Sequence, residues 1–185
     1  MKTTILSAEV PTEVRKAGDL LRRGELVAFH TETVYGLGAC ADDPAAVGEL
    51  YRIKKRPREK KCAILVPDPE DALQYLGYLS PAEKRLAAAF WPGPLTLVVG
   101  EEEATAVRCP DCPPTQEMLR AASVPVLAPS ANFSGHPPAR DADEVLEVFD
   151  GMIAAVLDGG RVERGTPSTV VKVEDGRLNI LREGI

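Results

Sequence analysis

The chain has 185 residues, of which 44% are hydrophobic, so it can bury the core of one domain, whereas two independent domains would be cramped. Its net charge of −6 and aromatic content of 5% argue against a broad nucleic-acid-binding face, which needs clustered cations and stacking aromatics. No stretch approaches membrane-spanning length, and the N-terminus lacks the apolar segment of a signal peptide, so we expect a cytoplasmic protein with no membrane partner.

Helix and strand patterns alternate along the chain. Apolar residues at helical spacing, together with caps at Thr12, Asp43 and Ser80 and a stop at Gly24, predict helices. Short apolar runs between turn signals predict strands, and the loop between the first strand and the second helix is polar and glycine-bearing. The predicted helices cover 13–23, 44–56, 69–76, 81–90, 115–122 and 141–149. The predicted strands cover 26–29, 62–66, 95–99, 106–108, 124–128, 153–157 and 168–173, and a hairpin over 172–181 turns at 174–176.

This alternation predicts one α/β domain over residues 1–185, with a mixed sheet because hairpin and proline signals interrupt the βαβ rhythm. Four cysteines are too few and too irregularly spaced to indicate a disulfide framework. Cys109 and Cys112 have the spacing of a redox pair or half a zinc site. Neither a second such pair nor histidines at ligand spacing accompany them, so we expect two small residues in a turn.

Positive charge is concentrated in one segment. Residues 54–61 hold six basic residues and one acid, whereas the rest of the chain carries 16 basic against 27 acidic residues. An acidic protein with one cationic cluster is suited to a compact anion such as the phosphates of a nucleotide. A solvated surface loop is the competing interpretation. Arg108 and Arg182, each at the end of an apolar strand where an unpaired charge is costly, favour the anion site.

Three further polar segments, 30–38, 129–135 and 165–169, adjoin predicted strands. Ligands of open α/β sheets bind where loops leave strand ends, so these segments and the basic cluster predict one binding crevice. The chain has no G-x-x-x-x-G-K-[ST] motif, which excludes a P-loop, and no G-x-S-x-G elbow. Residues 36–41 imitate a dinucleotide fingerprint, but they begin several residues after the strand and the next helix is delayed. We interpret them as coincidental.

Taken together, these segments resemble the YrdC family, the threonylcarbamoyl-AMP synthases of tRNA modification, from about residue 20 to residue 185. As a set the motifs are highly specific, although no single one is. The resemblance implies an open, twisted mixed sheet with flanking helices, in the short single-domain form without the C-terminal domain of longer relatives. The matching motifs are Thr31-Glu32-Thr33-Val34-Tyr35-Gly36-Leu37, Lys54-Lys55-Arg56-Pro57 with Lys60, Trp91-Pro92-Gly93-Pro94-Leu95-Thr96, Val107-Arg108-Cys109-Pro110, Pro129-Ser130-Ala131-Asn132-Phe133-Ser134-Gly135, Pro167-Ser168-Thr169-Val170-Val171 and Leu181-Arg182-Glu183-Gly184.

The resemblance implies a nucleotidyltransferase that condenses L-threonine, bicarbonate or CO2, and ATP into L-threonylcarbamoyl-AMP and releases pyrophosphate. A partner complex then passes the threonylcarbamoyl group to tRNA in t6A37 modification. Mg²⁺ is expected on the ATP phosphates, with no metal site built from protein ligands. The implied catalytic residues are Lys54 and Arg56. The implied ATP-binding residues are Arg56, Lys60, Ser130, Asn132 and Arg182, and the implied L-threonine-binding residues are Thr33, Arg108 and Ser168.

Two residues depart from the family pattern. His30 replaces the usual proline before Thr31, and Leu65 stands where some relatives have a polar residue facing the threonine. Two other functions stay open at this point. One is a non-catalytic module that binds double-stranded RNA or tRNA, and the other is a related carbamoyl-adenylate chemistry on a different acceptor, as in hydrogenase maturation.

Overall fold

The computed structural model of the protein describes residues 2–100, 104–174 and 176–185. Within them, strands and helices alternate as the sequence predicts. The strands are β1 (Thr4–Ser7), β2 (Val27–Phe29), β3 (Gly36–Cys40), β4 (Ile64–Leu65), β5 (Leu95–Val99), β6 (Thr105–Arg108), β7 (Val126–Leu127), β8 (Ala155–Asp158), β9 (Thr169–Glu174) and β10 (Arg177–Arg182). The helices are α1 (Pro11–Arg22), α2 (Pro44–Ile53), the 3-10 helix η1 (Pro69–Ala72), α3 (Leu73–Leu76), α4 (Pro81–Phe90), α5 (Pro113–Ala122) and α6 (Ala142–Phe149).

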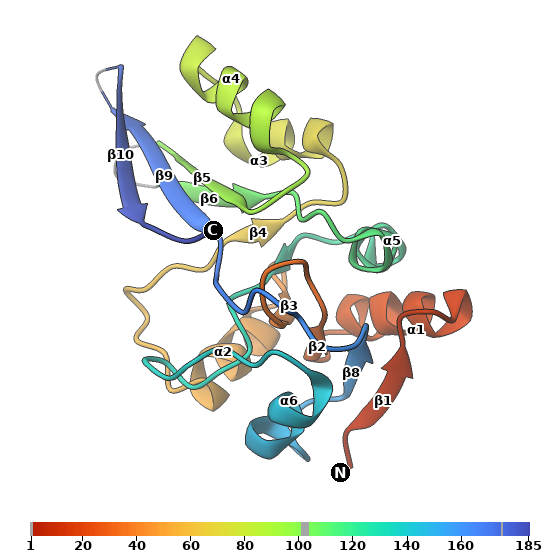
Figure 1. Cartoon of the computed structure of the whole chain (residues 1–185). Helices are drawn as coiled ribbons and strands as arrows, with labels where there is room; N and C mark the ends of the chain where they lie inside the picture. Colours follow the sequence, from red (N-terminus) through yellow and green to blue (C-terminus); the bar gives the residue numbers. More distant parts are fainter. Residues whose placement is uncertain (1, 101–103, 175) are drawn as a thin grey trace.

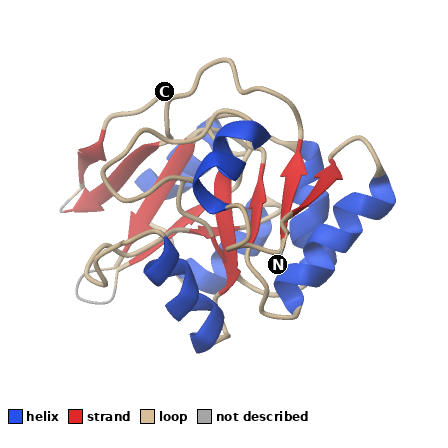
Figure 2. Ribbon diagram, turned by 90° about the horizontal axis from the view of Figure 1, so that it is seen from below, coloured by secondary structure: helices blue, strands red, loops and turns tan. Residues whose placement is uncertain are grey.

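The strands form one open sheet in the order β1-β8-β2-β3-β7-β4-β6-β5-β9-β10 (Figure 1). Parallel pairs such as β1 with β8 and β5 with β9 occur beside antiparallel pairs such as β2 with β3 and β9 with β10. Figure 2 shows the strands running through the molecule with helices on both sides. The predicted α/β fold, with an open mixed sheet and flanking helices, is therefore confirmed.

The part of the sheet around β8 and β2 is covered on both faces. Val27 and Phe29 point into a core shared with α1 and α5, whereas Ala28 between them points into a core shared with α2 and α6. This alternation follows from the two-residue period of a strand. Because both faces are buried, β2 and the first three residues of β8 have no polar face, which explains their apolar sequence.

The other half of the sheet is covered on one face only. Leu95 and Leu97 of β5 and Val107 of β6 face a third core, formed with η1, α3 and α4. Their neighbours along the strands, among them Thr96 and Arg108, face away from that core. The exposed face of this half is therefore available for a ligand.

Several local predictions were wrong. Residues 36–40, expected in a loop, form the fully buried strand β3. Strand β1 was not expected, helix α1 begins at Pro11 without the predicted Thr12 cap, and α2 ends at Ile53, before the basic cluster. The β9–β10 hairpin is confirmed by antiparallel pairing of Glu174 with Arg177, although Asp175 in the predicted turn lies outside the described residues.

The caps predicted for α2 and α4 were correct. Asp43 accepts hydrogen bonds from the backbone of Ala45 and Ala46, and Ser80 forms a capping box with Glu83. No helix in the described ranges is both long and apolar enough to cross a membrane.

Candidate functional site

A cavity of about 410 Å³ lies against the uncovered face of β5, β6 and β9. Its wall comes from alternate strand positions, such as Thr96 and Val98 of β5 and Ala106 and Arg108 of β6. The loops after β2, α2 and β7 and before β9 complete the rim. The loop residues in the lining are Thr31, Val34, Arg56, Glu59, Lys61, Ala63, Ala104 just before β6, Ala128, Pro129, Ser130, Pro167 and Ser168.

Three arginines from separate parts of the chain line this cavity. Arg56 donates from Nε to the carbonyl of Lys60 at 2.8 Å and from Nη2 to that of Lys61 at 2.9 Å, so it is anchored to its own loop. Arg182 donates to the carbonyl of Ser168 from both Nε (3.1 Å) and Nη2 (2.8 Å). Partial desolvation lowers the pKa of Arg182, and the nearby charges of Arg108 and Arg56 lower it further. The cavity thus concentrates positive charge, the electrostatic requirement for binding a polyanion.

A β-bulge turns Arg182 toward the cavity. Ile180 of β10 pairs with Val171, but Arg182 pairs with the adjacent Val170, which leaves Leu181 as an extra residue. Val171 faces the core under α4 and Val170 lines the cavity. If the same sequence paired without the bulge, Leu181 would pair with Val170 and Arg182 would point to the opposite face.

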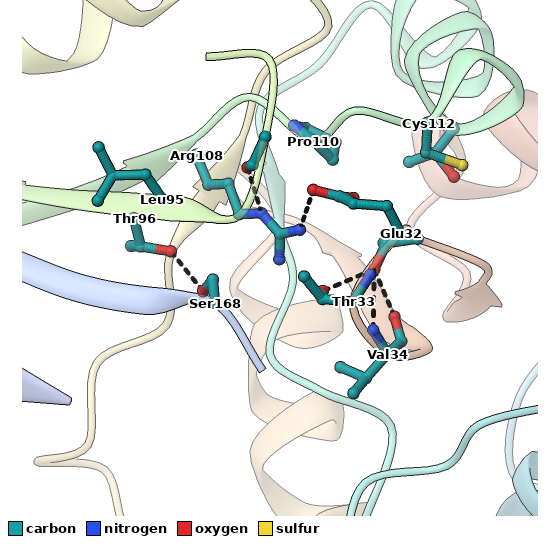
Figure 3. A network of polar contacts seen from close by, with 12 residues as sticks. Glu32, Thr33, Val34, Leu95, Thr96, Arg108, Pro110, Cys112 and Ser168 are labelled. Carbon is teal, nitrogen blue, oxygen red and sulfur yellow. Dashed lines mark hydrogen bonds and ion pairs between the residues drawn. The ribbon is translucent and has the colours of Figure 1, made fainter. Parts of the chain in front are cut away.

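Arg108 is held in a buried polar network (Figure 3). Its side chain is 8% exposed and donates from Nη2 to Oε1 of Glu32 at 2.6 Å and from Nε to the carbonyl of Gly93 at 3.2 Å. Nearby, the hydroxyls of Thr96 and Ser168 lie 2.8 Å apart, and Arg182 Nη2 donates to Ser168 Oγ at 3.1 Å. These bonds fix the orientation of the guanidinium and of the Ser168 hydroxyl at the cavity wall.

Lys54 lies behind the cavity and holds the loop after β7. Only 1% of the residue is exposed, and Nζ donates to the carbonyls of Ser130 at 2.5 Å and Asn132 at 2.6 Å. Burial, followed by the charge of Arg56, lowers the pKa of Lys54 to about 8. Asn132 accepts the Ser130 hydroxyl at 2.5 Å and donates to the carbonyls of Phe133 and His136. Ser130 itself lines the cavity.

The turn after β2 is ordered by its own hydroxyls. Thr31 Oγ1 donates to the carbonyl of Val34 and lies 3.0 Å from Thr33 Oγ1. Thr31 lines the cavity, whereas Thr33 is fully buried behind it. His30 is half-buried at the start of this turn, and burial lowers its pKa below the usual range.

The pair Cys109 and Cys112 lies in a turn, as predicted. Both thiols are free and buried, and burial raises the pKa of Cys109 to about 12. Such a thiol holds its proton at neutral pH and is a poor nucleophile. Cys112 Sγ lies 3.3 Å from Nδ1 of His30, so the pair of side chains stabilises the turn after β2 against α5. The described residues contain no group of three or more histidine, cysteine or acidic side chains that could hold a metal ion.

Nine residues were predicted to form the site, and the structure gathers five of them in the lining of one cavity. Lys60 is exposed outside the lining, and Thr33, Lys54 and Asn132 lie behind the wall. Sequence reasoning gave no site role to three further residues. Thr96 and Lys61 line the cavity, and Glu32 pairs with Arg108. Thr96 and Glu32 belong to the quoted motifs, so motif membership was the available signal. The five predicted residues in the lining are Arg56, Arg108, Ser130, Ser168 and Arg182.

Comparisons with known proteins identify the family of the chain. A model of the Sua5, YciO and YrdC family, described as "Telomere recombination", matches residues 19–184. The threonylcarbamoyl-AMP synthase of Bacillus subtilis (strain 168) is 37% identical over 98% of this chain and 56% of its own length. The synthase of Pyrococcus abyssi (strain GE5 / Orsay) is 39% identical over 93% of this chain and 54% of its own length.

Among solved structures, that of P. abyssi Sua5 complexed with L-threonine is similar, with a TM-score of 0.90 and 36% identity over 100% of this chain and 58% of that chain. The chain therefore spans little more than half the length of these relatives. The family match covers most of the sequence and includes every motif that lines the cavity. The chain belongs to the Sua5, YciO and YrdC family.

Proposed function

We propose that the protein is an L-threonylcarbamoyladenylate synthase, a nucleotidyltransferase that condenses L-threonine, bicarbonate or CO2, and ATP and releases pyrophosphate. The observation that carries the proposal is the convergence of Arg56, Arg108 and Arg182 on one cavity. Two relatives at 37% and 39% identity bear the name of this enzyme, which supports the assignment.

Arg56 and Arg182 suit the triphosphate of ATP. Both lie on the cavity wall, and each guanidinium is held by backbone carbonyls. A fixed arginine placed where charge grows on a leaving pyrophosphate stabilises the transition state without reorganising. Ser130 adds a hydroxyl at the rim, braced by Asn132, and Lys60 and Lys61 add positive charge near the opening.

Arg108 and Ser168 suit L-threonine. A buried arginine binds a carboxylate well, and Ser168 presents a hydroxyl held by Thr96 and Arg182. The structure of P. abyssi Sua5 complexed with L-threonine supports a threonine site in this fold. Thr33 contributes by fixing the Thr31 hydroxyl at the wall, and Leu65 in the lining offers an apolar contact for the threonine methyl group.

The proposed reaction has two bond-forming steps. The threonine nitrogen adds to CO2, forming a carbon–nitrogen bond and releasing a proton, which gives a carbamate. A carbamate oxygen then attacks the α-phosphorus. The bond from that phosphorus to the oxygen shared with the β-phosphorus breaks, and pyrophosphate leaves with the electron pair of that bond as negative charge. The protein contributes positioning and cations, and Lys54 contributes by holding the Ser130 loop.

ATP would enter as its magnesium complex, in which the ion neutralises part of the phosphate charge. Glu59 is the carboxylate in the described lining, and no carboxylate cluster accompanies it. This donor set fits an ion carried by the phosphates and by water rather than by a protein cage.

The product would supply a transfer complex that modifies tRNA to t6A37, and both ATP and tRNA place the reaction in the cytoplasm. The alternative, a module that binds RNA without catalysis, needs cations spread over a face. Here the arginines converge on a cavity sized for a small molecule, which favours the synthase.

Pyrophosphate release from ATP tests the proposal. We expect release to require both L-threonine and bicarbonate, and the acylated nucleotide to be detectable by mass spectrometry. Release without threonine, or none with all three substrates present, would contradict the function.

A further inference from the structure

Among the three arginines of the cavity, Arg108 differs in having a carboxylate partner within the described part of the chain. Its Nη2 lies 2.6 Å from Glu32 Oε1, and the two side chains are 8% and 23% exposed. The bonds found for Arg56 go to carbonyls, and those found for Arg182 go to a carbonyl and a hydroxyl. One corner of the cavity therefore holds an arginine paired with a carboxylate, whereas the bonds found for Arg56 and Arg182 leave their charges uncompensated.

The three arginines lie close enough to interact electrostatically. The charges of Arg108 and Arg56 both contribute to the lowered pKa of Arg182, so the three groups share one field. In such a field a phosphate would be drawn to any unpaired arginine. A carboxylate at 2.6 Å from Arg108 offsets its charge and repels phosphate from that corner.

The second oxygen of Glu32 provides the complementary feature. Oε2 is buried and has no hydrogen-bond partner among the described residues. A buried carboxylate oxygen without a donor is costly, and a bound N–H group would recover that free energy. Arg108 lines the cavity and Glu32 lies against it, outside the described lining, so a cation and an acceptor without a donor stand next to each other. This pair matches the carboxylate and ammonium of an α-amino acid.

We propose that Glu32 is a specificity-determining residue. It makes Arg108 bind a zwitterionic amino acid and repels phosphate from Arg108. The ammonium of the substrate would approach Glu32 Oε2 and its carboxylate would meet Arg108. This inference rests on the proposed function, because it assigns the amino-acid end of the same cavity. It gives a physical reason why Arg108 would take the amino acid while Arg56 and Arg182 take the phosphates.

Replacing Glu32 by glutamine tests the charge while keeping the size and an acceptor for Arg108. We expect the KM for L-threonine to rise about tenfold or more in Glu32→Gln, as for loss of a charge-assisted hydrogen bond, with the KM for ATP little changed. Inorganic phosphate should compete with ATP alone in the wild type, but also with L-threonine in the variant. A purely structural role for Glu32 would not create this new competition.

Glu49→Gln is the matched control, because Glu49 also pairs with an arginine, Arg52, at 2.6 Å, but on the exposed surface of α2. It should leave both KM values and the inhibition pattern unchanged. An unchanged threonine KM in Glu32→Gln, absence of competition between phosphate and threonine, or the same changes in Glu49→Gln would overturn the inference.

Calorimetry on the wild-type protein decides the question if Glu32→Gln does not fold. L-threonine should bind at least about tenfold more tightly than 2,3-dihydroxybutyrate, which has the carboxylate but no ammonium. Equal binding of the two would overturn the role of Glu32 even if turnover is normal. Conversely, selective threonine binding without any pyrophosphate release would refute the proposed function and leave the role of Glu32 intact.

Discussion

Neighbouring cations of one basic run have different environments in this protein. Lys54 is buried and holds the loop after β7 through two carbonyls, whereas Arg56, two residues later, lines the cavity. Lys55 between them is exposed, with its ammonium 4.5 Å from the ring centroid of Phe133. The helix ends at Ile53, so these side chains leave the chain in different directions.

Replacing Arg56 tests whether its position in the cavity lining matters for the rate of pyrophosphate release. We expect Arg56→Ala to lower the rate of pyrophosphate release by about 100-fold or more, since a positioned cation that stabilises the leaving group is lost. The far-UV circular dichroism spectrum should be unchanged, because the hydrogen bonds of Arg56 to the described residues stay within its own loop. The control is Arg58→Ala, an exposed arginine over the Tyr51 ring and outside the described lining. Equal loss in both variants would show that general positive charge matters and position does not.

Burial of Lys54 predicts a pH dependence of stability. Its pKa is about 8 in the folded chain against 10.5 ordinarily. Between these values the unfolded chain holds a proton that the folded chain has released, so this group makes the free energy of unfolding rise with pH. Relative to Lys54→Met, the wild type should gain up to roughly 3 kcal/mol across that interval.

Denaturant unfolding of both proteins at a series of pH values measures this difference. Tyrosine and cysteine ionisations occur in both chains and cancel in the comparison. Lys55→Met replaces the exposed neighbour, and its free energy of unfolding should change with pH in parallel with that of the wild type. Parallel curves for Lys54→Met would mean that the buried ammonium has an ordinary pKa.

At the level of elements, the bulge in β10 decides which residue lies opposite Val170. Deleting Leu181 should restore regular pairing and leave Arg182 opposite Val170, on the cavity side. We therefore expect the deletion to keep the KM for ATP near that of the wild type, whereas Arg182→Ala should raise it about tenfold or more. Leu181→Ala keeps the bulge and should also bind ATP normally. A deletion variant with the raised KM of Arg182→Ala would show that the bulge itself, and not the pairing with Val170, orients Arg182.

Prediction from the sequence succeeded for elements whose signals are local. The capping box at Ser80 and Glu83 and the Asp43 cap lie within one turn of the helices that they begin. Strand β3 was missed because its signal is not local. Its glycines suit a strand because a Cβ on Gly36 or Gly38 would lie 2.9 or 2.8 Å from the ring of Phe29 on the neighbouring strand.

Prediction of the site also succeeded for local signals and failed for contacts between distant segments. Motifs identified Arg56, Arg108, Ser130, Ser168 and Arg182, all of which line the cavity. The position of Lys54 behind the wall depends on carbonyls more than 70 residues away, which sequence pattern does not place. The partnership of Glu32 with Arg108 is likewise a contact between distant segments.

For the whole molecule, an acidic protein with a cationic cavity should distinguish compact anions from long ones. The net charge is −6, yet three arginines face one cavity of about 410 Å³. Pyrophosphate fits such a cavity, whereas a duplex RNA needs a broad basic face. At 100 times its dissociation constant, pyrophosphate should stabilise the folded chain by about 2.7 kcal/mol.

Thermal unfolding with and without pyrophosphate measures this stabilisation. The double variant Arg56→Ala/Arg182→Ala should lose the stabilisation, while Arg58→Ala should keep it, because Arg58 lies outside the described lining. Duplex RNA should neither stabilise the protein nor displace pyrophosphate, since it cannot enter the cavity where the arginines converge. If duplex RNA stabilises the chain as much as pyrophosphate, and does so without Arg56 and Arg182, then the exposed lysines of the basic cluster form the principal anion site and the cavity does not.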